Sequence, residues 1–216
     1  MSSTIKQRIE QLLSSTGNNQ TDAELLLVEI RHAIKNDPLL GKELGLYIAK
    51  LNAFIKLQNT STQLSWQQVA GGKLAIGHKP GGKVSFEGLK KDGATAIVTL
   101  LQENEGAHTI GKAAQQAGMT WLWLPFSASR PHSGNALVLV LEVFEQMQNI
   151  LKNSGGIYIH CSAGIHRTGM ITYGFLRHIG QSKSEALQTL MQLRVVTAEQ
   201  AGEDRLSWGD NFAIDT

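Results

Sequence analysis

Four short apolar stretches in the second part of the chain alternate with segments of helical character, and this alternation restricts the possible folds most. The stretches read KLAIGH, TAIVTLL, TWLWLP and GGIYIH, and their length and β-branched or aromatic content are typical of buried strands. The segments EGLKKDG and GKAAQQAG, which separate the first three, each close with a glycine, as many helices do. Strands that alternate with helices predict an α/β fold with a mainly parallel central sheet flanked by helices.

Further helices are predicted on both sides of the last strand. Apolar residues at helical spacing indicate a long helix from Leu137 to Leu151 ahead of GGIYIH. After that strand, TGMITYGFLRHIG and SKSEALQTLMQLR have the pattern of two more helices. The second of them opens with a capping box formed by Ser182 and Glu185.

The pattern of apolar residues is helical throughout the beginning of the chain. We predict an all-helical segment over residues 1–60 ahead of a second domain over residues 61–216. The polar stretch QNTSTQ marks the join. An apolar stripe at helical spacing comprises Leu40, Leu44, Tyr47, Ile48, Leu51, Phe54 and Ile55. We expect this stripe to pack onto the second domain; binding a partner or serving as a lid is the alternative.

Two local signals place helix starts within this segment. Thr21 and Glu24 have the spacing of a capping box. Asp37 precedes Pro38, which is the order of an N-cap residue followed by proline at the first helical position.

Composition excludes several function classes. With 20 basic and 18 acidic residues the net charge is +2, which does not indicate binding to nucleic acid or to an anionic membrane. The longest apolar run, ALVLVLEVF, is interrupted by Glu142 and is too short to span a bilayer. A single cysteine cannot form an internal disulfide, and the first residues do not resemble a signal peptide, so we expect a soluble cytoplasmic protein. The seven histidines show no paired-ligand spacing, so we expect no metal and no cofactor.

The one cysteine, Cys161, lies in a predicted turn between the strand GIYIH and a helix over residues 168–179. The start of a helix offers unpaired N–H groups and a positive dipole end, which suit a phosphate and lower the pKa of a thiol. Arg167 can bind two phosphate oxygens at once, and Gly164 lets the backbone bend without a Cβ in the way. Thr168 can donate a hydroxyl to the sulfur. This spacing favours a thiol nucleophile that attacks phosphorus.

The same stretch matches the pattern H-C-x-x-G-x-x-R-[ST]-G. Its fixed positions are filled by His160, Cys161, Gly164, Arg167, Thr168 and Gly169. From about residue 70 to residue 207 the chain resembles the cysteine-dependent protein tyrosine phosphatase superfamily, in its compact dual-specificity branch.

The resemblance implies roles for individual residues. Cys161 would form a phosphocysteine that water then hydrolyses, with Arg167 and Thr168 as further catalytic residues and His160 and Gly169 in support. The substrate phosphate would be held by the loop residues Ser162, Ala163, Gly164, Ile165, His166 and Arg167. His166 has two readings, one in which it faces the phosphate and one in which it points to solvent.

One part of the family pattern is missing. The family supplies a leaving-group proton from an aspartate, which should fall near residues 126–128, but WLWLPFSASRPHSGNA contains no carboxylate. A replacement acid could come from elsewhere; the candidates are Glu199, Glu203, Asp204, His132, Glu103 and Glu105. Alternatively, a phenolic leaving group with a pKa near 10 needs little assistance, or the protein binds phosphate groups without turnover.

The expected function is therefore a phosphatase for phosphate monoesters, acting on phosphotyrosine in proteins with dual specificity as an extension. The alternatives are a pseudophosphatase that binds phosphorylated partners and an enzyme for inositol phosphates or phosphoinositides. The stretch GHKPGGKV resembles a nucleotide-binding loop, but Val84 replaces the hydroxyl residue that would bind magnesium, so we reject that function. Its His78, Lys79 and Lys83 are expected to form an ordinary basic turn or to rim an anionic pocket.

Overall fold

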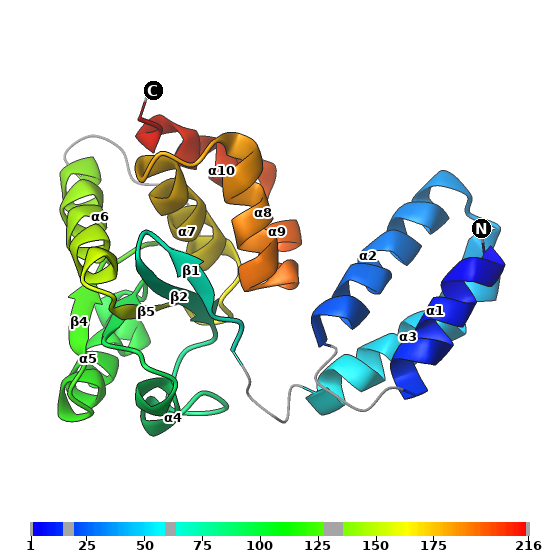
Figure 1. The fold of residues 1–216 in the computed structure, drawn as a ribbon, viewed down its shortest axis with the longest axis horizontal. Helices are drawn as coiled ribbons and strands as arrows, with labels where there is room; N and C mark the ends of the chain where they lie inside the picture. Colours follow the sequence, from blue (N-terminus) through cyan, green and yellow to red (C-terminus); the bar gives the residue numbers. More distant parts are fainter. Residues whose placement is uncertain (1, 15–19, 59–63, 128–135, 215–216) are drawn as a thin grey trace. The chain divides into compact units, whose positions relative to one another are not determined.

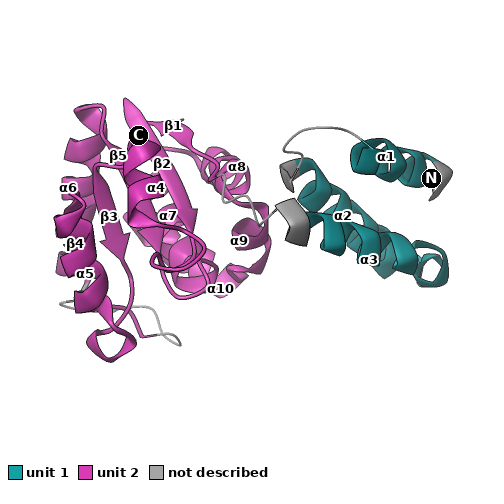
Figure 2. Ribbon diagram, turned by 90° about the horizontal axis from the view of Figure 1, so that it is seen from below, with its two compact units in different colours: residues 1–63 teal, residues 64–216 magenta. Residues whose placement is uncertain are grey.

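The computed structural model describes residues 2–14, 20–58, 64–127 and 136–214 (Figure 1). The chain forms two compact units, residues 1–63 and 64–216 (Figure 2). The boundary expected between residues 60 and 61 lies within 59–63, outside the described residues. No helix in the described ranges is long and apolar enough to cross a membrane.

The first unit consists of the helices α1 (Ser2–Ser14), α2 (Gln20–Asn36) and α3 (Leu40–Gln58), which pack on one another (Figure 1). Its core contains Ile9, Ile30, Leu44 and Leu51, none of which is exposed to solvent. Leu44 and Leu51 of the α3 stripe are buried in this core, and its other five residues are partly buried and pack against it. The stripe thus serves the core of its own unit, because three amphipathic helices can bury their apolar faces against one another. Packing onto the second domain stays a prediction.

The two helix starts differ slightly from those expected. Helix α2 begins at Gln20, so Thr21 lies within its first turn and not at the cap position; glutamine is a good helix former and extends the helix. The Oδ1 atom of Asp37 accepts a hydrogen bond from the backbone N–H of Leu39 at 3.1 Å, as an N-cap residue does, although regular helix begins only at Leu40.

The second unit is built on one five-stranded sheet in the order β1-β2-β5-β3-β4. Its strands are β1 (Gln67–Val69), β2 (Gly72–Gly77), β3 (Ala96–Thr99), β4 (Thr120–Trp123) and β5 (Gly156–His160). All neighbouring pairs are parallel except β1 and β2. The prediction of a mainly parallel sheet flanked by helices is confirmed.

Helices cover both faces of this sheet. Alternate side chains of β2, β3 and β5 pack with α4 (Phe86–Lys91) and α5 (Ala107–Gln116) on one face. The intervening side chains pack with α6 (Ala136–Lys152), α7 (His166–His178) and α8 (Lys183–Leu193) on the other. Because these strands are buried on both faces, their sequences are almost continuously apolar.

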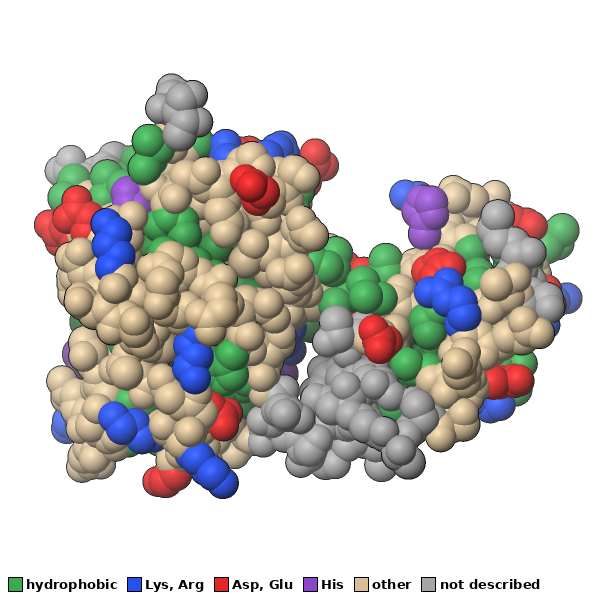
Figure 3. Space-filling model, in the orientation of Figure 1, with side chains coloured by type: hydrophobic (Ala, Val, Ile, Leu, Met, Phe, Trp, Pro, Cys, Tyr) green, Lys and Arg blue, Asp and Glu red, His purple; other side chains and the backbone are tan. Residues whose placement is uncertain are grey.

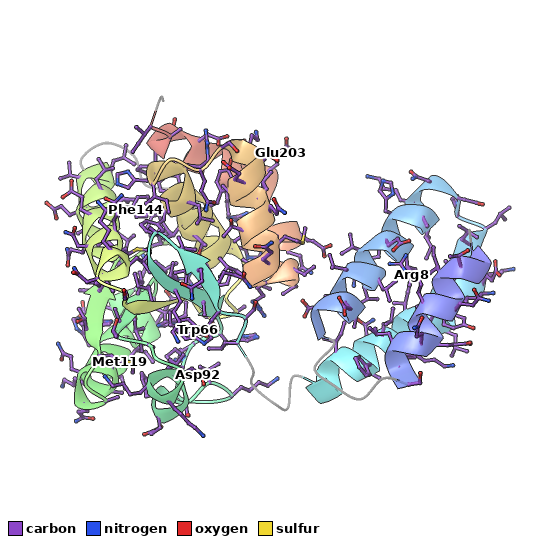
Figure 4. All side chains as sticks on the ribbon, in the orientation of Figure 1. Arg8, Trp66, Asp92, Met119, Phe144 and Glu203 are labelled. Carbon is purple, nitrogen blue, oxygen red and sulfur yellow. The ribbon has the colours of Figure 1, made fainter. Side chains whose placement is uncertain are left out.

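The core on the face of the sheet covered by α6, α7 and α8 also includes Phe212. Phe144 of α6 lies between helices there (Figure 4), with its ring 5.5 Å from that of Phe175 and 5.2 Å from that of Phe212. Phe212 belongs to the short 3-10 helix η2 (Asp210–Phe212), which follows α9 (Val195–Gln200) and α10 (Glu203–Gly209). At the start of α8 the capping box of Ser182 and Glu185 is confirmed by reciprocal hydrogen bonds of 3.3 and 2.8 Å. Acidic and basic side chains are interspersed over the face seen in Figure 3.

Candidate active site

The cysteine follows β5, which lies between β2 and β3 in the middle of the sheet. Ligands of open α/β sheets bind beyond the carboxyl ends of such strands. Residues 161–165 form the turn, and α7 begins at His166, two residues earlier than predicted. The N-cap residue Ile165 offers no side-chain hydrogen bond to the helix, so its side chain does not compete with an anion for the first amides of α7.

The turn depends on Gly164. This residue has φ of +68°, a backbone conformation that side chains disfavour, and a Cβ atom on it would lie 2.2 Å from the carbonyl oxygen of Gly77 at the end of β2. The loop therefore rests directly on the neighbouring strand.

The sulfur of Cys161 is nearly buried, with 4% of the residue exposed. Burial by itself would raise its pKa, but hydrogen bonds from the Thr168 side chain and from the backbone amides of Thr168, Ile165 and Gly164 together lower the pKa of Cys161 below its ordinary value. The Gly164 amide lies 3.2 Å from the sulfur. Among the described residues the buried hydroxyl of Thr168 has no other hydrogen-bond partner, so it can donate to the adjacent sulfur.

His160 is fully buried next to the cysteine, and both of its ring nitrogens are used. Its Nδ1 lies 3.0 Å from the carbonyl oxygen of Cys161, which can only accept, so Nδ1 carries the proton. Its Nε2 accepts from the Thr99 hydroxyl at 3.0 Å, and Thr99 accepts from the indole N–H of Trp121 at 2.9 Å. Burial lowers the pKa of His160 to about 4, so the ring is neutral and supports the loop as a hydrogen-bond donor and not as a cation.

Arg167 is also buried and is oriented by acceptors from other segments. It forms two hydrogen bonds with the carboxylate of Glu105, from Nη1 at 2.6 Å and from Nη2 at 2.8 Å. Nη1 also donates to the carbonyl oxygens of Leu100 at 3.3 Å and Phe126 at 3.1 Å. Among the described residues, these contacts use both Nη1 protons and one Nη2 proton. The remaining Nη2 proton and the Nε proton form the other edge of the guanidinium, which has the geometry to bind phosphate bidentately. Glu105 first, and then the Cys161 sulfur, raise the pKa of Arg167.

Glu105 ends the short 3-10 helix η1 (Glu103–Glu105), and its role was not foreseen. The hydrogen bond from Arg167 lowers the pKa of Glu105, so this carboxylate is ionised and does not suit the role of proton donor considered for it. Arg167 and Glu105 are separated by 62 residues. The one local signal, the capping box of Gln102 and Glu105, indicates a turn but not this ion pair.

The other candidate acids are spread over the second unit. Glu203 and Asp204 are exposed on the first turn of α10 (Figure 4), and Glu199 is exposed near the end of α9. His132 lies outside the described residues. Phe126, at the start of the stretch where the family has its aspartate, is fully buried and contributes its carbonyl oxygen to Arg167.

The other residues of the pattern differ in their exposure. Ser162, Ala163 and His166 are exposed, whereas Gly169 is buried where a Cβ atom would meet the Cβ of Ala201 at 2.6 Å. No group of three His, Cys, Asp or Glu side chains in the described residues is placed to hold a metal ion.

Comparison with known families decides the identity of this arrangement. The family model Tc-R-P, described as a polymorphic toxin system DSP-PTPase phosphatase, matches residues 71–181. The chain belongs to this family. Its cysteine loop and the whole pattern from His160 to Gly169 lie inside the matched region. No curated protein sequence matches the chain.

Solved structures share the fold of this DSP-PTPase phosphatase at low sequence identity. A kinase associated phosphatase with its catalytic-site cysteine replaced by serine has 18% identity and a TM-score of 0.57, over 69% of this chain and 93% of that chain. The active form of Tk-PTP has 21% identity and a TM-score of 0.54, over 68% and 97%. PTPMT1 in complex with PI(5)P has 15% identity and a TM-score of 0.53, over 68% and 94%.

Proposed function

We propose that this phosphatase hydrolyses phosphate monoesters through a phosphocysteine at Cys161 and that its principal substrate is phosphotyrosine in proteins. The observation that carries the proposal is the buried sulfur whose pKa is lowered by three loop amides and a threonine hydroxyl, at the open start of α7. A thiolate held in this way can act as a nucleophile, and it lies beside backbone amides that can bind the oxygens of a phosphate.

In the first step the thiolate attacks phosphorus, an S–P bond forms, and the bond between phosphorus and the ester oxygen breaks. The loop amides and the Nε–Nη2 edge of Arg167 hold the three non-bridging oxygens as charge redistributes. The leaving oxygen takes the electron pair of the broken bond and a proton from water or from an acid of the protein.

In the second step a water molecule attacks the phosphocysteine. The water loses a proton, inorganic phosphate is released, and the sulfur leaves as a thiolate. Thr168 assists here, because its buried hydroxyl can donate to the departing sulfur as negative charge returns to it.

The preference for phosphotyrosine follows from the leaving group. Residues 121–127 contain no carboxylate, and the Phe126 side chain is buried where the family places its acid. A positioned acid accelerates a reaction by about 100- to 10,000-fold, and its loss affects an alkoxide far more than a phenolate with a pKa near 10. Substrates with phenolic oxygens are therefore favoured.

Turnover of an aryl phosphate compared with an alkyl phosphate tests the proposal, with C161S as the control that keeps the size of the side chain. We expect hydrolysis of the aryl ester by the wild type only, weak or no hydrolysis of the alkyl ester, and a phosphorylated Cys161 peptide after rapid acid quenching. Equal turnover by C161S, or phosphate found on another residue, would refute the mechanism.

A second function, binding of phosphorylated partners without turnover, is favoured by one contact. Arg167 donates through Nη1 to the carbonyl oxygen of Phe126, in the stretch 121–127 that contains no carboxylate, so the anion site has its arginine but no acid beside it there. Turnover of neither ester together with retained binding of a phosphotyrosine peptide would establish this function. Turnover of inositol phosphates in preference to such a peptide would instead support the small-molecule alternative.

A further inference from the structure

The backbone carbonyl oxygens of residues 161–164 all accept hydrogen bonds from groups outside the cysteine loop, which comprises residues 161–165. The carbonyl oxygen of Cys161 accepts from His160 Nδ1 at 3.0 Å, and that of Ser162 accepts from the backbone N–H of Lys79 at 3.1 Å. The next two, of Ala163 and Gly164, accept from Nη1 of Arg194 at 3.1 and 2.7 Å. In a planar trans peptide the C=O and the following N–H point in opposite directions. Carbonyls fixed outward therefore keep the amides of residues 162–165 pointing inward.

We propose that Arg194 is a positioning residue for the cysteine loop. It lies between α8 and α9, 33 residues after Cys161 and beyond the region that matches the family model. Its guanidinium contacts the back of the loop and not the ligand side. One cationic group thus holds two successive carbonyls and, through them, the amides of Gly164 and Ile165, which are two of the donors to the sulfur.

Two neighbours keep Arg194 in place. Its Nη2 lies 3.0 Å from Nε2 of His78, and because a guanidinium can only donate, His78 must accept there and be neutral. Burial, followed by the charges of Arg194 and Lys83, lowers the pKa of His78, which agrees with this tautomer. Thr197 lies 3.2 Å from Nη1 of Arg194, and its hydroxyl also donates to the carbonyl oxygen of Gly164 at 2.6 Å.

The segment that carries His78 is itself attached to the sheet. The hydroxyl of Tyr158 on β5 donates to the carbonyl oxygen of His78 at 2.8 Å, and the adjacent Lys79 amide holds Ser162. The basic turn 78–83 is thus a support for the loop. Its role depends on backbone and imidazole contacts and does not require it to bind nucleotide.

The test compares R194K and R194M with the wild type in the full chain. Lysine keeps the charge but cannot replace the fork of a guanidinium, whereas methionine removes both. The matched control is R205M, because Arg205 Nη1 also donates to a backbone carbonyl, that of Ala201 at 3.3 Å, but not to a residue of the cysteine loop. The readouts are the dissociation constant for vanadate, the pH midpoint of Cys161 alkylation by iodoacetamide, and kcat and KM for an aryl phosphate.

We expect R194M to weaken vanadate binding and to lower kcat by about 10- to 100-fold, less than the loss of an oxyanion donor itself, which costs about 100- to 1,000-fold in kcat. Its alkylation midpoint should shift to higher pH, R194K should lie between R194M and wild type, and R205M should match wild type. A folded R194M with wild-type vanadate affinity and alkylation midpoint would overturn the proposal.

Two further comparisons keep the test decisive. If R194M fails to fold, R194K and T197V, which each remove part of the support of Gly164, must still shift the alkylation midpoint; unchanged midpoints in both would overturn the proposal. The catalytic readout rests on the proposed function, whereas the alkylation midpoint does not. If the wild type hydrolyses no ester, the proposed function fails, and a midpoint shift in R194K still supports the positioning role.

Discussion

At the scale of single residues, the hydroxyl of Thr168 is the group whose contribution is most specific to one step. Because it is buried beside the sulfur, T168A should slow departure of the thiolate in the second step more than attack in the first. We expect the phosphocysteine to accumulate, seen as a burst of aryl alcohol followed by slow turnover. T168S, which retains the hydroxyl, should restore wild-type kinetics. A T168A variant without a burst and with unchanged kcat would contradict this role.

Glu105 is expected to act through Arg167 and not as an acid. The hydrogen bond from Arg167 lowers the pKa of Glu105 below that of an ordinary glutamate. The carboxylate is therefore ionised at neutral pH and carries no proton to donate. In E105Q the neutral amide still accepts one hydrogen bond but loses the ion pair with Arg167. We expect kcat/KM for an aryl phosphate to fall by about tenfold, a loss of about 1.4 kcal/mol in transition-state stabilisation.

The shape of the pH profile separates the two roles of Glu105. If it only orients Arg167, the alkaline limb of kcat in E105Q should match that of the wild type. An alkaline limb that disappears in E105Q would identify Glu105 as the general acid and contradict the assignment.

At the scale of secondary-structure elements, one hydrogen-bond chain crosses three strands. It runs from Trp121 on β4 through Thr99 on β3 to His160 on β5 and ends on the carbonyl oxygen of Cys161. Since every member is neutral, protonation of His160 would place a charge in the interior of the sheet. The hydrogen bonds that support the cysteine loop are therefore expected to weaken in acid.

The hydrogen bonds from Trp121 to Cys161 predict a specific pH dependence of protein stability. The pKa of His160 is about 4 when folded and 6.5 as the reference, so the unfolded state takes up the proton first as pH falls. Its contribution is complete above pH 6.5 and is lost as pH falls toward 4, which amounts to about 3 kcal/mol. H160N, which retains a donor near the position of Nδ1, should show a smaller decrease in the free energy of unfolding by urea over this range. Equal decreases in both proteins would contradict the assignment.

Sequence reasoning succeeded where the information is local and failed where it is not. The four apolar strands are recognisable because burial on both faces makes them continuously apolar, and the cysteine loop is recognisable because its parts are contiguous. Strand β1 was missed because its hairpin turn, formed by Ala70 and Gly71 with φ of 49° and 91°, lacks the usual Asn-Gly signal. The pairing of Glu105 with Arg167 and the contacts of Arg194 were missed because nothing near these residues in the sequence records their distant partners.

At the scale of the whole molecule, the two units have separate cores. Every contact cited for the active site is made within residues 64–216, and the helices of the first unit bury their apolar stripes among themselves. We therefore expect a fragment of residues 64–216 to fold alone and to hydrolyse an aryl phosphate with kcat/KM within about twofold of the full chain. A fragment that is unfolded by circular dichroism, or folded but more than about tenfold less active, would show that the helical unit contributes to the site.

The central claim is that the cysteine loop lowers the pKa of Cys161 and so favours its thiolate. Since the chain has one cysteine, an ultraviolet titration of thiolate absorbance with C161S as the blank reports on this sulfur alone. The structure predicts a midpoint below the value near 8.5 of an ordinary cysteine, because the hydrogen bonds to the sulfur outweigh the effect of burial. A midpoint at or above that value would contradict the account of the site and of the reaction assigned to it.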